Sequence, residues 1–398
     1  MRKAYIVGVG QTPRKHFPQK GLGTLAAEAT YKALDDAKMD IKDIQHVYFG
    51  TYHPAAHMQF TPGQMIVDAI GLSTKVGVTD IEHACATSGH TLHEGRLAIA
   101  SGVYDAVLVL SASKTFDSLQ SRNTNESISY GSFSVERGIM LGHADFEGYA
   151  KEYGVGDEEI YGWYKTEYWH ATRNPISVCY GEHERVLSFE DYCKLPYNVW
   201  YAAPQKFGAG STVVDGGSAI ILASKEVAKR HTDKLISIEA LVCRDESSYY
   251  PHSLQHTRFE MMTAGVLRNA FQAAFDQAKI KPKDLDLYQP HDNTPYINFS
   301  HVDVFFQLYD PKMPPGYGPK WYALGYAMPG GPLPLSSAAT AKCGYMMPVH
   351  FLDDNIENVK QLREEVQEPE RQIKMKNYLT MATVSPERPV VCILRREK

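Results

Sequence analysis

Paired cysteines and long apolar runs are both missing from this sequence. The 398 residues hold only 6 cysteines, none spaced as Cys-x-x-Cys, which argues against a disulfide framework and against a zinc site built by this chain. No window approaches the roughly 18 consecutive apolar residues of a membrane-spanning helix. The first apolar run is too short for a secretion signal and ends at Gly10-Gln11-Thr12-Pro13. We therefore expect a cytoplasmic protein that binds no membrane.

A strong charge of either sign is also missing. The chain has 41 basic and 46 acidic residues, a net charge of -5, and no basic stripe, so nucleic acid is not an expected partner. The composition, 43% apolar and 22% charged, is that of a globular protein, and its length allows two or three cores. Tyrosine is the one excess, with 25 Tyr against 15 Phe and 4 Trp.

Strand-like apolar runs alternate with amphipathic helical stretches, which predicts an α/β fold. We expect strands at 3–9, 44–49 and 106–110 and helices at 24–38 and 90–101. Thr24 is the expected N-cap of the first helix. The strand at 106–110 is apolar throughout, which suits a sheet covered on both faces.

The second half repeats part of the first. Residues 274–285 match residues 33–44 at six of twelve positions, at an offset of 241. Both stretches follow a helix and lead into a strand, which favours a duplication over a chance match of common helix residues. We also match the strand at 106–110 with the last apolar run, 390–394.

These patterns divide the chain into two similar halves and one insertion. The expected parts are an N-terminal half at 1–115 plus 205–232, an inserted loop domain at 116–204 and a C-terminal half at 233–398.

Cys85 lies in His83-Ala-Cys-Ala-Thr-Ser-Gly-His90, just before a helical stretch. The free N–H groups and positive dipole end of a helix favour a thiolate and can hold an oxyanion. A small buried cysteine with no chemical role explains the same pattern equally well.

His291-Asp292-Asn293 follows a predicted strand at 285–288, at the strand end where α/β sheets place their sites. His53 occupies the duplicated position. Later in the chain, Gly330-Gly331 permits close backbone approach, and Ser336-Ser337 are expected to cap the next helix.

Five short motifs occur in the order found in thiolases. They are Cys85 among small residues, Asn174-Pro175, Asp215-Gly-Gly-Ser-Ala, the His291-Asp292 pair and Gly330-Gly331. Over essentially its whole length the chain resembles a thiolase of the sterol-carrier-protein type. The resemblance implies a duplicated five-layer αβαβα fold with two buried central helices. It also implies acyl transfer between CoA thioesters through an acyl-cysteine, with coenzyme A as co-substrate, and a homodimeric core.

Carried over by this resemblance, Cys85 is the nucleophile and His291 helps to bind the thioester oxygen. Two departures stand out: the family's second cysteine in the His-Asp motif is Asn293 here, and its cysteine-activating histidine is Ser337. A serine hydroxyl cannot deprotonate a thiol near pH 7, so another base is needed.

Histidine is the natural substitute for the lost base, because its pKa lies near neutrality. The candidates are His53, His57, His83, His90 and His143. His143 is favoured, because related acyltransferases carry a histidine near this point of the insertion. Cys343 is either a second acid/base group or, more simply, part of a buried helix.

The inserted segment is rich in aromatic residues, namely Tyr161, Trp163, Tyr164, Tyr168, Trp169, Tyr180, Tyr192, Tyr197, Trp200 and Tyr201. These rings either line an acyl pocket or pack a local core. Divergent thiolases of this kind work with a small zinc-binding OB-fold partner protein. We therefore expect a degradative thiolase that cleaves a bulky 3-oxoacyl-CoA. Benzoylsuccinyl-CoA, whose acyl group carries an aryl ring, is an example of such a substrate.

Two other functions remain open. One is the acyltransferase subunit of a biosynthetic complex that forms C–C bonds, although such relatives keep a Gly-His-Ala stretch where this chain has Ser336-Ser337-Ala338. The other is a catalytically inactive scaffold for a partner protein, which the lost histidine favours and the retained Cys85 and His291 oppose.

Overall fold

The computed structural model describes residues 2–52, 61–72, 74–114, 147–196, 211–245, 265–386 and 388–397. Its strands are β1 Tyr5–Gln11, β2 His46–Gly50, β3 Gly77–Ile81, β4 Ala106–Ser113, β5 Gly216–Ala223, β6 Ile236–Cys243, β7 Leu287–Gln289, β8 Leu379–Val384 and β9 Val390–Arg396. Its α-helices are α1 Leu22–Ala37, α2 Pro62–Ala69, α3 Thr87–Ser101, α7 Asp157–Ala171, α8 Phe189–Lys194, α9 Lys225–His231, α12 Gly265–Ala278, α13 Pro295–Tyr309, α14 Tyr317–Ala323, α15 Thr340–Gly344 and α16 His350–Arg363.

Five 3₁₀ turns join these elements: η1 Ile41–Asp43, η3 Ala84–Ala86, η4 His183–Arg185, η5 Pro282–Asp284 and η6 Pro369–Arg371. Within the ranges given above, none of the helices combines the length and the apolarity needed to cross a bilayer.

The strand order repeats itself across two halves. Strands β2-β4-β5-β1 lie side by side in one half, and β7-β8-β9-β6 lie in the same order in the other. In each half the first pair is parallel and the next two pairs are antiparallel. Strand β3 extends the first half, and a single parallel bridge between Tyr288 and Leu335 stands at the matching place in the second. A short antiparallel contact of β1 with β6 joins the halves.

The predicted sequence repeat is a structural repeat as well. In both copies a helix, α1 or α12, ends at a lysine in the left-handed region, Lys38 or Lys279, each with φ of 53°. A 3₁₀ turn follows, in which Asp43 or Asp284 accepts a hydrogen bond from a backbone N–H three residues earlier. The duplication inferred from residues 33–44 and 274–285 is therefore confirmed.

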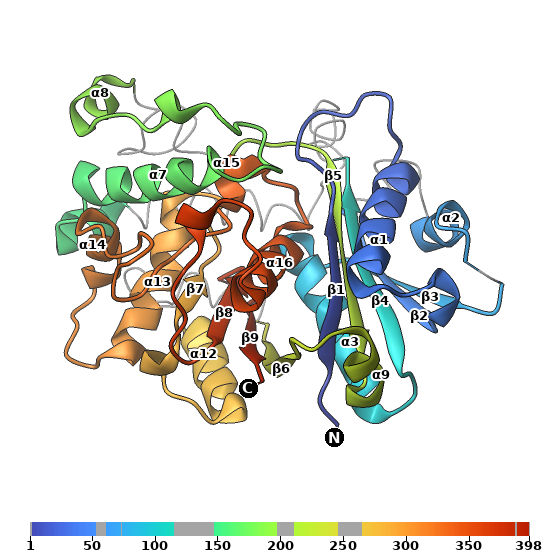
Figure 1. Cartoon of the computed structure of the whole chain (residues 1–398). Coiled ribbons are helices and arrows are strands. Elements are labelled where there is room, and N and C mark those ends of the chain that lie inside the picture. Colours follow the sequence, from blue (N-terminus) through green and yellow to red (C-terminus); the bar gives the residue numbers. More distant parts are fainter. Residues whose placement is uncertain are drawn as a thin grey trace, which may run out of the picture.

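Three apolar clusters make the layers. Along β5, Ala219 and Ile221 face the cluster under α1, while Ile220 and Leu222 face the cluster around α3 and α16. The second half has its own outer cluster, in which α12 and α13 pack on β6, β8 and β9. Strands buried on both faces read as continuous apolar runs. The expected αβαβα arrangement, with α3 and α16 between the strands of the two halves, is confirmed and can be followed in Figure 1.

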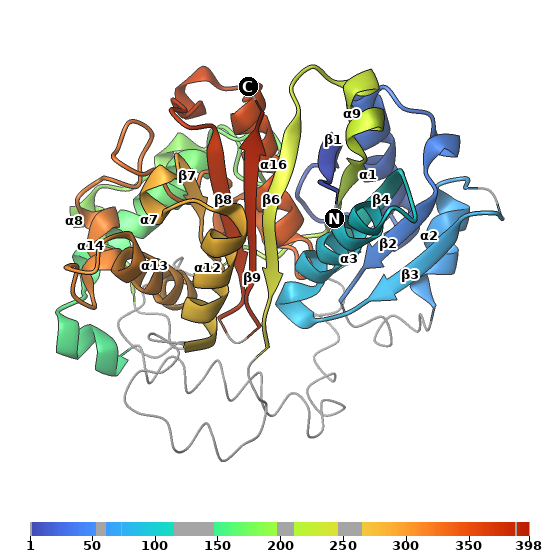
Figure 2. The same ribbon diagram turned by 90° about the horizontal axis from the view of Figure 1, so that it is seen from below.

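Helix α3 approaches the strands of both halves closely. A Cβ atom on Gly89 would lie 2.9 Å from the side chain of Val390 in β9, so only glycine fits at this crossing. Figure 2 shows β6, β9 and β8 side by side with α3 next to them. This close packing fixes the start of α3, and with it the preceding turn η3 in which Cys85 lies, against the second half of the chain.

Two expectations about local structure are wrong. Thr24 does not cap the first helix, because α1 begins at Leu22 and Gly21 precedes it in an extended conformation. The strand at 106–110 does not correspond to the run at 390–394. Strand order makes β8 the counterpart of β4, and β9 the counterpart of β5. Apolar composition alone cannot distinguish these strands, because all of them are buried.

The described part of the inserted segment packs on the second half of the chain. Helix α7 lies against α14 and α15 (Figure 1). Trp163, Tyr164 and Tyr192 are buried in the same apolar cluster as α12 and α13, and the rings of Tyr164 and Tyr192 lie 5.1 Å apart. These rings form a local core. Tyr197, Trp200 and Tyr201 lie outside the described residues, and the boundaries 1–115 plus 205–232, 116–204 and 233–398 stay a prediction.

Candidate active site

Cys85 lies in the 3₁₀ turn η3, between the end of β3 and the start of α3. Ala84, the residue before it, has φ of 48°, a strained conformation for a residue with a side chain. The Thr87 hydroxyl accepts from the His83 N–H and donates to the Ala84 carbonyl, both at 2.7 Å. Cys85 is therefore presented on a tight turn at a helix N-terminus, as expected from the sequence, and it is partly exposed.

His291 follows β7 and is buried, with 2% of its surface exposed. Its Nδ1 atom lies 3.2 Å from the backbone N of Ser385. Because a backbone N–H can only donate, Nδ1 is the acceptor, and neutral His291 carries its proton on Nε2. Burial lowers the pKa of His291 to about 3, so the ring is neutral near pH 7.

Tyr345 connects the two predicted residues. Its hydroxyl lies 3.3 Å from His291 Nε2 and donates to Cys85 Sγ at 3.6 Å. The resulting chain of donors runs from His291 through Tyr345 to the sulfur atom. Burial, followed by the neighbouring Cys85, raises the pKa of Tyr345 well above its usual value, so the hydroxyl keeps its proton. Sequence reasoning brought Cys85 and His291 together but missed Tyr345.

Tyr52 is a second tyrosine next to the cysteine. Burial raises its pKa to about 12, and the negative charge of a Cys85 thiolate adds to the shift. Neither Tyr52 nor Tyr345 stands out among 25 tyrosines in the sequence. The one usable signal is that Tyr345 follows Ser337, the position of the expected activating histidine, in the same late part of the chain.

His350 is stacked on both members of the donor chain. Its ring centroid lies 4.6 Å from that of His291 and 4.7 Å from that of Tyr345. His350 begins α16 and is fully buried, and neither ring nitrogen has a hydrogen-bond partner among the described residues. Burial lowers its pKa well below the usual value. The stack holds the Tyr345 ring in place without adding charge.

Ser337, the residue at the position of the family's activating histidine, is fully buried. Its hydroxyl accepts from Gln289 Nε2 at 2.6 Å, and its carbonyl accepts from Arg371 at 3.0 Å. Ser336 hydrogen-bonds with Tyr322 instead. The expectation that these serines cap a helix is wrong, because α15 starts after Ala339 with no side-chain cap.

Asn293 lies two residues beyond His291, and its carbonyl oxygen accepts from the Ser211 hydroxyl. Its side-chain oxygen is buried and has no partner in the described part of the chain. Gly331 behaves as expected: a Cβ there would lie 2.1 Å from the carbonyl oxygen of Tyr326. That close approach requires glycine.

The histidines considered as replacement bases fall into two groups. His53, His57 and His143 lie outside the described residues. His83 and His90 stack on each other, with ring centroids 3.8 Å apart and an angle of 11° between the rings.

Asp245 lies close enough to His83 and His90 for the three to be considered as a metal site. The in-plane lone pairs of stacked rings run parallel instead of converging, so this geometry does not suit coordination. Burial, followed by the charge of His83, lowers the pKa of His90 to about 4.

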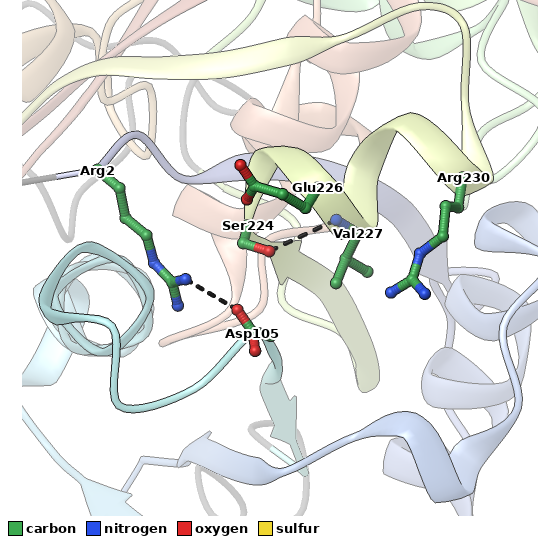
Figure 3. Close-up of a pocket in the computed structure, with 6 residues that line it drawn as sticks. All are labelled: Arg2, Asp105, Ser224, Glu226, Val227 and Arg230. Carbon is green, nitrogen blue, oxygen red and sulfur yellow. Dashed lines mark hydrogen bonds and ion pairs between the residues drawn. The ribbon is translucent and has the colours of Figure 1, made fainter.

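Two other features lie away from the donor chain. Cys343 is fully buried in the outer cluster of the second half, and burial raises its pKa to about 12, so it packs a core. A hollow of about 530 Å³ is lined by Arg2, Asp105, Ser224, Glu226, Val227 and Arg230, and Figure 3 shows these side chains. This hollow adjoins the start of β4, whereas Cys85 follows the end of β3. Both strands pair in parallel with β2, so they run in the same direction. The hollow is therefore at the opposite edge of the sheet.

Comparison with known families agrees with this site. The profile described as "Thiolase, N-terminal domain" matches residues 4–145, and the one described as "Thiolase C-terminal domain-like" matches residues 249–384. The chain belongs to the thiolase superfamily. The first match contains Cys85, and the second contains His291 and Tyr345.

Individual relatives place this thiolase among acyltransferases of the sterol-carrier-protein type. The chain is 28% identical to the acetyl-CoA acetyltransferase of Methanocaldococcus jannaschii, over 73% of each chain. It is 25% identical to sterol carrier protein 2 of Gallus gallus, over 73% of this chain and 54% of that protein.

Two further similarities concern assemblies. Identity to the benzoylsuccinyl-CoA thiolase subunit BbsB of Thauera aromatica is 23%, over 83% of this chain and 81% of that one. A solved structure titled "Ltp2-ChsH2(DUF35) aldolase" shares the fold, with a TM-score of 0.74 at 18% identity, and covers 100% of this chain and 98% of that one.

Proposed function

We propose that this thiolase cleaves a bulky 3-oxoacyl-CoA with free CoA, through an acyl-cysteine on Cys85. The observation that carries the proposal is the Tyr345 hydroxyl, which joins Cys85 Sγ to His291 Nε2. A sulfur atom at a helix N-terminus that also receives a tyrosine hydrogen bond is stabilised as the thiolate, which is the nucleophilic form.

The chemistry needs three steps at this sulfur. The Cys85 thiolate attacks the 3-keto carbon, and the bond between that carbon and the α-carbon breaks. The departing acyl-CoA carbanion takes a proton, and among the described residues Tyr345 is an acid that hydrogen-bonds with the sulfur. Free CoA then attacks the acyl-cysteine and returns its thiol proton to Tyr345. The single Nε2–H of His291 donates to the Tyr345 hydroxyl in the free enzyme and can donate to the thioester oxygen instead once substrate is bound.

The cysteine of the free enzyme must first lose its own proton. Tyr345 cannot take it, because burial keeps that hydroxyl protonated. We propose His143 as the base, since Ser337 is engaged with Gln289 and cannot serve. Asn293 completes the proposed site through its buried side-chain amide.

The substrate and partner proposals rest on the relatives. Similarity to BbsB supports a bulky or aryl acyl group such as that of benzoylsuccinyl-CoA, and a role in aromatic degradation. The words "subunit" and "DUF35" in the names of similar proteins support a partner protein. We propose a homodimeric core in complex with a small zinc-binding OB-fold protein, working in the cytoplasm.

Product counting tests the reaction class. The purified protein, alone and with a co-purified partner, is incubated with benzoylsuccinyl-CoA and free CoA, and thioesters are quantified by mass spectrometry. A thiolase consumes one CoA and yields two thioesters per turnover. Release of an aldehyde or ketone and one thioester from the matching 3-hydroxyacyl-CoA, with no CoA consumption and no cleavage of benzoylsuccinyl-CoA, would make the chain a lyase, in line with the aldolase of the same fold, and would overturn the proposal.

A further inference from the structure

Three ionisable side chains lie fully buried next to the site and have no role in the proposed reaction. Glu167 comes from α7, Asp292 from the loop after β7, and Lys342 from α15. Each is 1% exposed or less. Charges are almost never buried unless they are paired, because removing them from water costs several kcal/mol. Their protonation states therefore follow from the contacts they make.

Asp292 is the carboxyl with more hydrogen-bond donors around it. Burial raises its pKa, and the hydrogen bonds that it accepts from the Thr340 hydroxyl and from the backbone N–H groups of Thr340 and Ala341 oppose that shift. Burial lowers the pKa of Lys342 to about 8, while the nearby carboxyls of Glu167 and Asp292 favour its charged form. The Lys342 ammonium lies 5.3 Å from the ring centroids of Trp163 and Tyr168, a cation–π arrangement.

Glu167 has the opposite surroundings. Among the described residues, neither of its carboxyl oxygens accepts a hydrogen bond of normal geometry. Its carboxyl contacts that of Asp292, and the Ser336 hydroxyl and Lys342 lie nearby and act in the opposite direction on its pKa. Burial, followed by the charge of Asp292, raises the pKa of Glu167 well above its usual value. Two carboxyls in contact hold one proton between them, because both cannot be ionised at that distance.

We propose that Glu167 is a positioning residue: as a neutral acid it donates a hydrogen bond to Asp292 and ties α7 to the loop that carries His291. Asp292 is the next residue after His291, so an anchored Asp292 fixes the backbone from which His291 reaches Tyr345. The inserted segment, through α7, thereby controls the donor chain to Cys85. The expected effect on kcat rests on the proposed function, whereas the protonation state of Glu167 does not.

Two substitutions of Glu167 distinguish the effect of its hydrogen bond to Asp292 from the effect of its side-chain volume. Glu167→Gln keeps an N–H donor toward Asp292, and kcat is expected to stay within about 3-fold of the wild type. Glu167→Leu removes the donor and leaves Asp292 short of one partner. We expect kcat to fall by about 10-fold to 100-fold with KM nearly unchanged, because His291 is displaced rather than lost. Equal kcat values for the two variants would overturn the positioning role.

Infrared spectroscopy tests the shared proton without any turnover. At pH 7 the wild type should show the C=O stretch of a protonated carboxylic acid, and the Glu167→Gln difference spectrum should show its loss. A spectrum with no such loss would overturn the proposal, even if Glu167→Leu fails to fold. If the wild type cleaves no thioester, the proposed function fails, while the infrared result still decides the state of Glu167.

Discussion

The hydroxyl of Tyr345 donates to the sulfur of Cys85 at 3.6 Å, across 260 residues of chain. The helix N-terminus of α3 and the loop after α15 meet at this contact. Gly344, just before Tyr345, has φ of 130°, which glycine adopts without strain. Ala84, just before Cys85, has φ of 48°, a strained conformation for a residue with a side chain. Such conformations persist only where the surrounding structure enforces them.

Tyr345→Phe removes the donor but keeps the ring that stacks on His350 and His291. We expect the rate of Cys85 acylation to fall by about 100-fold, the size of effect typical of one positioned proton donor. The rate is measured by stopped flow, as the release of the acyl-CoA that leaves when Cys85 is acylated. Tyr180→Phe is the matched control, because Tyr180 is 50% exposed and bonds only a surface glutamate among the described residues. Equal rates for the two variants would remove Tyr345 from the mechanism.

Ser337→Ala tests whether the residue at the position of the lost histidine takes part in chemistry. Its hydroxyl accepts from Gln289, which also donates to Asn358 at 3.3 Å. Loss of one buried hydrogen bond should lower the free energy of unfolding by about 1–3 kcal/mol. We expect kcat to change by less than about 3-fold. A folded variant whose kcat drops by about 10-fold or more would show that Ser337 acts in the reaction.

His143→Ala tests the proposed base. We expect thiolysis to slow by about 100-fold, with the alkaline part of the pH–rate profile least affected, because hydroxide then deprotonates the thiol without help. His183→Ala, a change in a 3₁₀ turn of the inserted segment, is the comparison. An unchanged rate in the His143 variant would leave the base to be found elsewhere.

Acid stability follows from the buried histidines. Burial lowers the pKa of His291 to about 3, and it lowers the pKa of His170, His301 and His350 well below the usual value. Unfolded histidines bind a proton near pH 6.5, so below that pH each of these four side chains binds more protons in the unfolded chain than in the folded one, whereas a buried neutral carboxyl such as Glu167 has the opposite effect. The contribution of the histidines to stability should therefore fall as the pH falls from about 6.5 toward 3, by up to about 1.4 kcal/mol per pH unit for each histidine.

The urea midpoint at pH 7.5 and at pH 5.5 measures this effect. His350→Phe keeps the stacked ring and removes one titrating group, so its midpoint should fall less between the two pH values. An equal change of midpoint in the wild type and in His350→Phe would contradict the burial of a neutral His350.

Local sequence patterns predicted the strands, the repeat and the position of Cys85, because apolar period and turn chemistry act over a few residues. The resemblance to thiolases, and not local pattern, placed Cys85 and His291 in one site. Tyr345 could not be found this way. Its role depends on a contact between distant segments, and nothing in its neighbours distinguishes it from a core tyrosine. The wrong match of 106–110 with 390–394 also arose because position in the sheet depends on distant segments. Buried strands at different places in the sheet have the same apolar composition.

Covalent capture on Cys85 tests the central claim most directly. The protein is mixed with 3-oxoacyl-CoA in the absence of free CoA, and its intact mass is recorded. We predict that the mass increases by that of the acyl group and that the increase disappears when CoA is added. The increase should be absent in Cys85→Ala. It should be retained in Cys243→Ala, because Cys243 is a second partly buried cysteine packed on the same apolar cluster. An unmodified mass under conditions of demonstrated turnover, or an adduct that survives Cys85→Ala, would contradict the account.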